Sequence, residues 1–242
     1  MKMKANLRSK PMNNPIILAL DVDTRDQALK IADDTAEIVG GFKLGPRLCL
    51  RYGKDFVKEI AARGPVFLDN KHFDIPSTME AAVRASFEAG ASLVTVHALS
   101  GAEALTTMAK VEKELNAIRP FKILAVTILT SWDQNSLPKN MKEQPIAKHV
   151  QDLAALVKSS GLNSVVCSPH ELDLLQNEDL YLVTPGIRFS MQDSGDQKRI
   201  MGPKEALKKG ASALVVGRPI LEASNLVEAA TEFVMAVYEE KL

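Results

Sequence analysis

The chain has few cysteines, no excess of either charge and no long apolar segment. Cys49 and Cys167 are the two cysteines in 242 residues. Two cysteines form neither a disulfide framework nor a metal-ligand pattern, so a reducing cytoplasm is the expected compartment. Thirty basic residues balance thirty acidic ones, so nucleic acid and anionic membranes are not expected partners. A membrane helix needs about 20 consecutive apolar residues, and the sequence contains no such run.

The sequence also lacks an internal linker. Residues 1–14 contain four basic residues and no apolar segment, which indicates a flexible, solvated N-terminal tail rather than a signal peptide. No Gly/Ser-rich stretch or change of composition interrupts residues 15–242, of a chain that is 46% hydrophobic and 25% charged. This composition is sufficient for a sizeable core, and we expect a single domain over residues 15–242.

Short runs rich in Val, Ile and Leu alternate with longer helical patterns, which is typical of βαβ units around a parallel sheet. Eight such units in one domain favour a closed (β/α)₈ TIM barrel. A doubly wound sheet is the alternative, and the absence of a Gly-x-Gly-x-x-Gly turn after the first run disfavours it. The predicted strands are Ile16–Ala19, Gly41–Leu44, Val66–Leu68, Leu93–His97, Ile123–Thr127, Ser164–Cys167, Leu182–Thr184 and Ala213–Val216.

Several helix starts are marked by a capping residue followed three positions later by Glu or Gln, which is the spacing of an N-cap and the third helical residue. The pairs are Thr24 with Gln27, Ser77 with Glu80, Ser100 with Glu103, Ser168 with Glu171 and Asn225 with Glu228.

The stretch Asp69–Asp74 is the first candidate for chemistry. Asp69 and Lys71 follow an apolar run and stand two residues apart, so on a strand their side chains point to the same face. Asp74 can fold back toward them, and Lys43 ends the preceding strand in the same way. An ordinary ion pair at a strand end is the simplest interpretation. However, such a cluster is costly to desolvate unless its members pair, and clusters of this kind concentrate at functional sites.

Further polar residues follow other predicted strands. In a TIM barrel the carboxyl ends of the strands form one rim, where active sites lie. We expect His97 to be structural, because no cysteine or carboxylate stands at a ligand spacing from it. The residues expected at this rim are Asp21, Lys43, Asp69, Lys71, His97, Thr130, Ser131, Arg188 and Arg218.

Two loops near the end of the chain suit an anion. Gly217 lets the backbone approach an anion closely, and Arg218 offers a fork of donors that matches phosphate oxygens. Arg188 lies in the loop after the preceding strand, and phosphate sites in barrels often use these two loops. Residues 189–201 form a polar loop with the length and composition of a lid.

Together these motifs resemble the orotidine 5′-phosphate decarboxylase family of the bacterial type, from Ile16 to the last helix. The D-x-K-x-x-D motif alone is shared with sister decarboxylases and synthases. Asn70, His72, Phe73 and Ser77 depart from the family's usual residues. The motifs that carry the resemblance are Ala19-Leu20-Asp21, Lys43, Asp69-x-Lys71-x-x-Asp74-Ile75-Pro76 with Thr78, Leu129-Thr130-Ser131, Val183-Thr184-Pro185-Gly186-Ile187-Arg188, Gly195-Asp196-Gln197-x-Arg199 and Val216-Gly217-Arg218-Pro219.

The resemblance implies a carboxy-lyase that converts orotidine 5′-phosphate to UMP, the last step of de novo pyrimidine synthesis. It implies a cytoplasmic homodimer with active sites at the subunit interface and with no cofactor or metal. Lys71 would protonate C6 of the pyrimidine, within a charge network completed by Lys43, Asp69 and Asp74. The substrate-binding residues would be Asp21 and Lys43 at the ribose, Asp74 and Thr78 there from the other subunit, Ser131 at the base, Gln197 between base and phosphate, Gly217 and Arg218 at the phosphate, and Thr130 and Arg188 at further contacts.

Three other functions remain open at this point. A metal-dependent sugar-phosphate decarboxylase or synthase of the same superfamily would share the D-x-K-x-x-D motif but would have an acidic metal ligand where Lys43 stands. A Schiff-base aldolase could use Lys71 as its nucleophile. A catalytically inactive nucleotide sensor could bind the same ligand without turnover.

Overall fold

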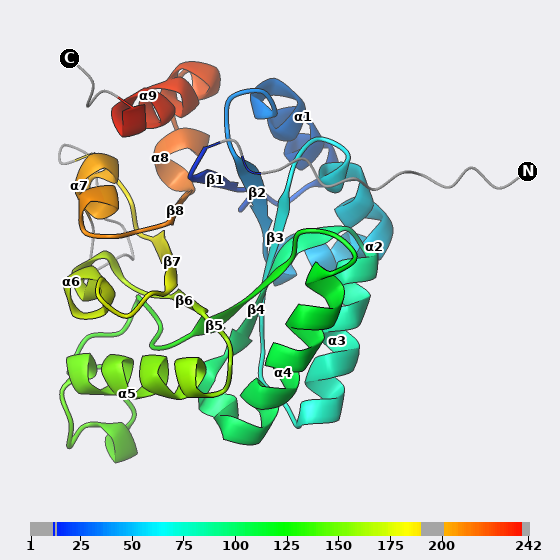
Figure 1. Cartoon of the computed structure of the whole chain (residues 1–242). Coiled ribbons are helices and arrows are strands. Elements are labelled where there is room, and N and C mark those ends of the chain that lie inside the picture. The colour runs from blue at the N-terminus through cyan, green and yellow to red at the C-terminus, as the bar shows by residue number, and fades with distance from the viewer. Residues whose placement is uncertain (1–11, 13, 190–200, 239–242) are drawn as a thin grey trace, which may run out of the picture.

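The computed structural model describes residue 12, residues 14–189 and residues 201–238. Eight parallel strands close into a barrel in the order β1 to β8, and the helices surround it (Figure 1). The predicted TIM barrel is therefore confirmed. The strands are β1 Ile16–Ala19, β2 Gly41–Leu44, β3 Val66–His72, β4 Ala91–His97, β5 Lys122–Val126, β6 Ser164–Val166, β7 Tyr181–Pro185 and β8 Ala213–Val216.

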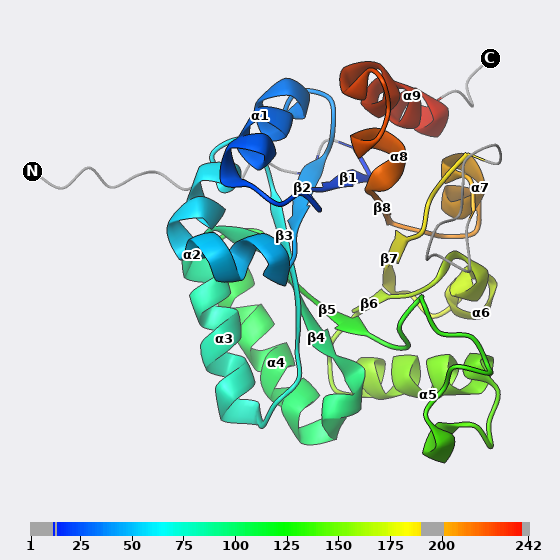
Figure 2. The same ribbon diagram turned by 180° about the vertical axis from the view of Figure 1, so that it is seen from behind.

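The helices differ in length around the barrel. Figure 2 shows the longer helices α1 to α4 on one flank and the shorter α6 to α8 on the other. The helices are α1 Arg25–Thr35, α2 Pro46–Ala61, α3 Pro76–Glu88, α4 Gly101–Asn116, α5 Ile146–Ser159, α6 Leu172–Leu175, α7 Pro203–Lys208, α8 Arg218–Leu221 and α9 Leu226–Tyr238, and the 3₁₀ helices are η1 Ala98–Ser100, η2 Lys139–Met141 and η3 Pro169–Glu171. Within the described ranges, no helix is both long enough and apolar enough to cross a membrane.

Three of the predicted helix caps form. Thr24 Oγ1 accepts a hydrogen bond from the Gln27 N–H at 3.3 Å. Asn225 Oδ1 accepts one from the Glu228 N–H at 3.2 Å. Ser168 forms a complete capping box with Glu171, although it opens the 3₁₀ helix η3 rather than an α-helix.

The other two predicted caps do not form. Ser100 precedes α4, but its hydroxyl makes no capping bond and is buried without a partner among the described residues. The prediction that Ser77 is an N-cap is wrong, because α3 begins at Pro76 and already includes Ser77. The first helical position suits proline, because an N–H there has no partner within the helix and the φ angle of proline is already helical. Ile75 is therefore the N-cap. Glu80 instead pairs with Arg84 at 2.8 Å.

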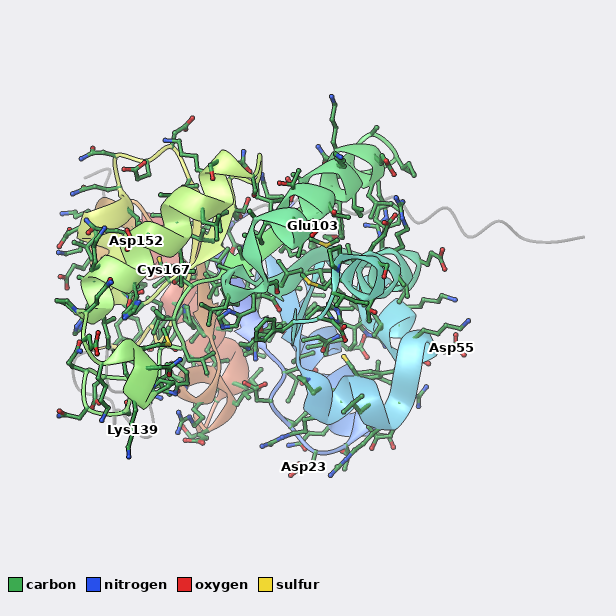
Figure 3. All side chains as sticks on the ribbon, turned by 90° about the horizontal axis from the view of Figure 1, so that it is seen from below. Asp23, Asp55, Glu103, Lys139, Asp152 and Cys167 are labelled. Atoms are coloured by element: carbon green, nitrogen blue, oxygen red, sulfur yellow. The ribbon has the colours of Figure 1, made fainter. Side chains whose placement is uncertain are left out.

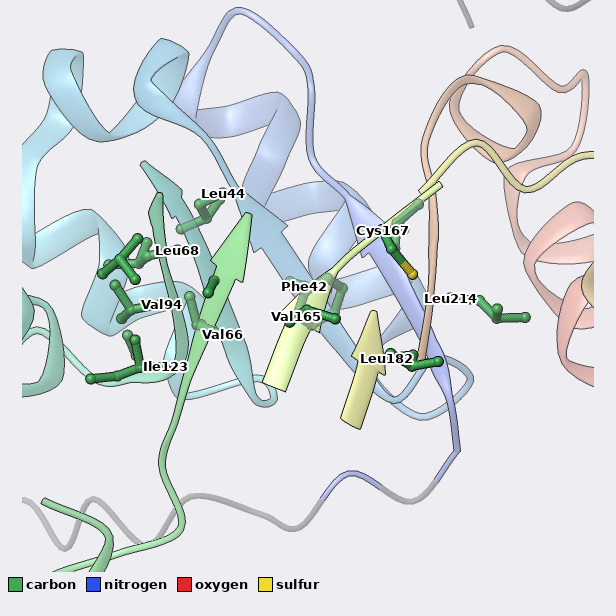
Figure 4. Close-up of a cluster of buried hydrophobic side chains, with 14 of the residues drawn as sticks. Phe42, Leu44, Val66, Leu68, Val94, Ile123, Val165, Cys167, Leu182 and Leu214 are labelled. Carbon is green, nitrogen blue, oxygen red and sulfur yellow. The ribbon is translucent and has the colours of Figure 1, made fainter. Parts of the chain in front are cut away.

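Successive side chains on each strand point to opposite faces of the sheet, so the apolar residues form two layers. The smaller layer fills the barrel and includes Ile17, Phe67, Leu124 and Val215. The larger lies between the strands and the helices, and Figure 4 shows part of it, with members from Phe42 to Leu214 labelled. Cys167 belongs to this larger layer, whereas the charged side chains labelled in Figure 3 lie toward the outside. Both cysteines are free thiols.

Candidate active site

A cavity of about 530 Å³ opens at the carboxyl ends of the strands. Residues from β1, β2, β3, β5, β6, β7 and β8, or from the loops that follow them, line it. This is the rim at which TIM barrels place their chemistry. The predicted site residues that line the cavity are Asp21, Lys43, Asp69, Lys71, Thr130, Arg188, Gly217 and Arg218.

Four of these residues form a continuous chain of opposite charges. Lys71 Nζ lies 2.8 Å from Asp69 Oδ1. Lys43 Nζ lies 3.9 Å from Asp69 Oδ2 and 3.1 Å from Asp21 Oδ1. The side chains of Lys43 and Asp69 are only 13% and 17% exposed, so their charges are poorly screened and their pairing offsets the cost of burial. The predicted clustering of Lys43, Asp69 and Lys71 is confirmed.

The end of β3 is a bulged strand. Between Leu68 and His72, β3 advances four residues while β4 advances two, from Val94 to Val96. Lys71 has a φ of +49°, in the left-handed region that lysine seldom adopts and that costs about 1–3 kcal/mol where it occurs. Such strain persists where the surroundings enforce it, and it concentrates at functional sites. Asp69 and Lys71 do meet, but a distorted backbone brings them together rather than simple alternation.

Thr95 on β4 supports this distorted segment. Its buried hydroxyl accepts a hydrogen bond from the Lys71 N–H at 2.8 Å and donates one to Asp69 Oδ1 at 3.1 Å. Asp69 Oδ1 therefore receives both the Lys71 ammonium and the Thr95 hydroxyl, which fixes the orientation of the carboxylate. Thr95 is not among the site residues predicted from the sequence. A threonine two residues before His97 in an apolar strand is the signal that could have identified it.

Asp74 and Thr78 do not line the cavity of their own chain. Asp74 is exposed, and its Oδ1 accepts a hydrogen bond from the Ile75 N–H at 2.7 Å. In the described part of the chain, no ion pair joins Asp74 to Lys71. The surface beside Asp74 is apolar, with Phe73 and Ile75 62% and 64% exposed.

The predicted base and lid residues are placed only in part. Thr130 lines the cavity, whereas Ser131, the next residue, is exposed and does not. Gln197 and most of the predicted lid, residues 190–200, lie outside the described residues.

The loops after β7 and β8, which the sequence predicts to bind an anion, both line the cavity. Arg188 is buried and lies with Arg218 along the cavity lining. A Cβ at position 217 would stand 3.5 Å from Ala19 Cβ and 3.7 Å from Asp21 Oδ2. Glycine therefore leaves space beside Asp21 for a ligand atom. Two guanidinium groups and this open backbone are suited to a phosphate group.

Two histidines near the rim favour the neutral form. Burial, and secondarily the charge of Lys71, lowers the pKa of His97, and burial lowers the pKa of His72. His97 Nδ1 accepts a hydrogen bond from the Leu99 N–H at 3.3 Å, and its ring lies 5.6 Å from that of Phe73. These contacts support a structural role for His97. Among the described residues, no cluster of three His, Cys, Asp or Glu side chains could hold a metal.

A closed (β/α)₈ barrel with a charged cavity at the carboxyl ends of its strands defines a TIM-barrel enzyme that can act on an anionic ligand. The model of the "Orotidine 5′-phosphate decarboxylase / HUMPS family" matches residues 14–233. The chain belongs to this family, and the resemblance drawn from its motifs is confirmed.

Individual members of the family align with most of the chain. The orotidine 5′-phosphate decarboxylase of Vibrio vulnificus (strain CMCP6) is 41% identical over 216 residues, which cover 88% of this chain and 93% of that protein. The enzyme of the same name from Geotalea daltonii is 41% identical over 227 residues, or 92% and 95% of the two chains. The crystal structure of orotidine 5′-phosphate decarboxylase from Lactobacillus acidophilus superposes with a TM-score of 0.79 at 33% identity, covering 93% of this chain and 99% of that one.

Proposed function

We propose that this protein decarboxylates orotidine 5′-phosphate to UMP in pyrimidine nucleotide synthesis, with Lys71 as the proton donor to C6. The observation that carries the proposal is the charge chain from Asp21 through Lys43 and Asp69 to Lys71, whose two central members are largely buried. It lies in a cavity whose lining also includes two arginines, Arg188 and Arg218, which are suited to a phosphate. The relatives named above are orotidine 5′-phosphate decarboxylases.

The reaction requires fixed charge more than covalent chemistry. When the bond between C6 and the carboxylate breaks, CO₂ leaves and the electron pair stays on C6, in the plane of the ring, where no π-system accepts it. Preorganised charges must therefore stabilise the carbanion. The ammonium of Lys71 provides a positive charge beside C6 and then gives C6 its proton. Solvent restores the proton to Lys71.

Asp69 has two effects in this scheme. It holds the Lys71 ammonium at 2.8 Å, and its negative charge beside the substrate carboxylate favours departure of that carboxylate as neutral CO₂. Lys43, on the other side of Asp69, keeps the site from accumulating uncompensated negative charge. The network thus favours the charge distribution of the transition state over that of the bound substrate.

The remaining cavity residues hold the rest of the nucleotide. Asp21 and Lys43 bind ribose hydroxyls, Thr130 contacts the base together with Ser131, which follows it outside the cavity lining, and Arg188, Gly217 and Arg218 bind the phosphate. Gln197, which follows β7 in the sequence, bridges base and phosphate. The phosphate lies far from C6, so its binding energy is available to close that loop over the substrate.

The active form is a homodimer in which Asp74 and Thr78 of each subunit complete the site of the other. Both residues lie outside the cavity of their own chain. The exposed apolar side chains Phe73, Ile75 and Leu99 surround this region of the surface, and a two-fold contact would bury them. The free thiols of Cys49 and Cys167 fit the cytoplasm as its compartment.

The position of Lys43 favours this reaction over that of a metal-dependent sugar-phosphate enzyme. Its ammonium lies between two carboxylates, 3.1 Å from Asp21 and 3.9 Å from Asp69. It therefore occupies the place in which the rival function requires an acidic ligand, and it would repel a divalent cation there.

The deciding experiment follows the absorbance of orotidine 5′-phosphate with the purified enzyme, with and without EDTA. We expect equal turnover in both. Loss of activity on chelation with recovery in magnesium would instead support the metal-dependent reaction. Trapping of the enzyme with borohydride in the presence of substrate would indicate a Schiff base, and nucleotide binding without turnover would indicate a sensor.

A further inference from the structure

The loop between β1 and α1 carries Asp21 but has few backbone contacts. The Leu20 N–H donates to the Lys43 carbonyl at 2.9 Å, the last such bond before the loop. Within the described ranges, Asp21, Val22 and Asp23 form no hydrogen bond to another backbone group. The position of Asp21 therefore depends on side chains that reach this loop.

Two arginines of α2 reach it. Arg47 Nη1 donates to the Asp21 carbonyl at 3.2 Å, and Arg51 Nη1 donates to the Asp23 carbonyl at 2.9 Å. The arginines stand four residues apart and so project from one face of the helix. Arg47 Nη1 also lies 3.6 Å from Asp23 Oδ1. Asp23 lies at the outer surface (Figure 3), and both side chains of this pair are well exposed, so the ion pair contributes little.

Asp21 is consequently held at both of its ends by one β2–α2 unit. Lys43 at the end of β2 binds its carboxylate, and Arg47 in the first turn of α2 binds its carbonyl. Arg47 lines the cavity, whereas Arg51 does not.

We propose that Arg47 is a positioning residue that aligns Asp21 for the ribose, with Arg51 as a second support of the same loop. This inference rests on the proposed function, in which Asp21 binds ribose hydroxyls. The planar guanidinium offers donors in fixed directions, so Arg47 can hold the Asp21 carbonyl while another of its N–H groups faces Asp23.

The first test replaces Arg47 with methionine, which keeps most of the length and removes the donors. We expect the KM for orotidine 5′-phosphate and the Kd for UMP, measured by calorimetry, to rise about five- to tenfold, the effect of losing one well-placed hydrogen bond. We expect kcat to change less than about twofold, because the hydrogen bonds by which Thr95 orients Asp69 and Lys71 do not involve this loop. Arg47→Lys should recover part of the affinity.

A double-mutant cycle separates positioning from direct contact with the ligand. The Kd for UMP is measured for Arg47→Met, Asp21→Ala and the double variant. If Arg47 acts through Asp21, adding Arg47→Met to Asp21→Ala changes the Kd less than about twofold. Additive losses would overturn the proposal and make Arg47 a direct ligand contact.

Arg51→Met and Arg63→Met complete the design. Arg51 lies outside the cavity lining, so a rise in the Kd of Arg51→Met, which we expect to be smaller, can only come from a change in the loop. This variant also keeps the proposal testable if Arg47→Met does not fold. Arg63 joins the end of α2 to Asp33 on α1 at 2.6 Å, away from the cavity. Arg63→Met therefore controls for general loosening between α1 and α2, and its Kd should equal that of the wild type. An unchanged Kd for Arg51→Met, or an equal rise for Arg63→Met, would overturn the proposal.

The cycle also separates this proposal from the proposed reaction. Binding of UMP is measured without turnover. A wild-type protein that binds UMP but does not release CO₂ would overturn the proposed reaction alone. A wild-type protein that does not bind UMP would overturn both proposals.

Discussion

Asp69 Oδ1 lies 2.8 Å from Lys71 Nζ, although the left-handed backbone of Lys71 interrupts the strand that carries both residues. An ion pair of adjacent same-face residues would form on an ordinary strand without such distortion. The bulge therefore does more than bring the two charges together, since it also directs Lys71 toward the cavity. Strain retained at such a point fits a residue whose position matters for chemistry.

Replacing Lys71 with alanine should abolish turnover and leave nucleotide binding largely intact. The variant loses both the proton donor and the positive charge beside C6, and a general acid alone contributes about 10²- to 10⁴-fold. The ribose and phosphate contacts assigned above do not involve Lys71, so UMP should bind within a few-fold of the wild-type affinity. Turnover by absorbance and binding by calorimetry provide the two measurements. A parallel loss of UMP binding would mean that Lys71 has a structural role instead.

Replacing Thr95 with valine should reduce both stability and kcat. Valine keeps the shape but removes the hydroxyl, which leaves the Lys71 N–H without its partner and Asp69 without one donor. An unsatisfied buried group costs about 1–3 kcal/mol, which urea unfolding would detect. The KM should change less than kcat, because the affected groups lie at the reacting end of the substrate.

Thr127→Val is the matched control for Thr95→Val. Thr127 is also buried, and its hydroxyl donates to the Val166 carbonyl at 3.2 Å. Within the described residues, its side chain forms no hydrogen bond with the charge network, so this variant should lose stability with little change in kcat. Equal losses of kcat in the two variants would show that Thr95 acts only through general stability.

The barrel and most of its rim could be predicted from the sequence, because apolar runs and the polar residues that follow them are local signals. The predicted bounds of β1, β2 and β8 agree with the structure. The sequence predicts that β3 ends at Leu68, because the charged residues that follow do not resemble a strand, whereas β3 continues to His72. The positive φ of Lys71 could not be predicted, because it results from pairing with β4 rather than from lysine itself.

Contacts between elements that are distant in the sequence could not be predicted either. From the sequence, Arg47 is expected on a solvated helix face. Its hydrogen bond to the Asp21 carbonyl depends on how α2 packs beside the β1–α1 loop. The role of Thr95 could not be predicted for the same reason, because its hydroxyl contacts Asp69 only across the β3–β4 pair. Such contacts have no fixed spacing along the chain, which is why motif and periodicity do not reveal them.

Stability should fall as the pH is lowered through about 6.5, the ordinary pKa of histidine. Burial lowers the pKa of both His72 and His97 in the folded protein. Below the unfolded pKa, the unfolded chain therefore binds protons that the folded chain does not, and the free energy of unfolding decreases. Above this range both histidines are neutral in both states and add no pH dependence. Urea unfolding between pH 5.5 and 8 measures the effect.

The variant His97→Gln identifies the share of this pH dependence that belongs to His97. Glutamine does not titrate, so the fall in stability toward acidic pH should become shallower. An identical slope in His97→Gln and the wild type would assign the acid sensitivity to other groups.

Asp74 should act in the neighbouring subunit, and mixed dimers can test this without a structure of the complex. Lys71→Ala and Asp74→Ala are prepared as separate, inactive homodimers, then unfolded, mixed in equal amounts and refolded. In a mixed dimer with shared sites, one site receives both substitutions and the other receives neither, because the Asp74→Ala chain provides a normal Lys71 and its partner provides a normal Asp74. Random pairing makes half of the dimers mixed, so roughly a quarter of wild-type activity should return. If Asp74 served its own chain, every site would carry one substitution. No recovery in dimers shown to have exchanged subunits would therefore assign Asp74 to its own chain.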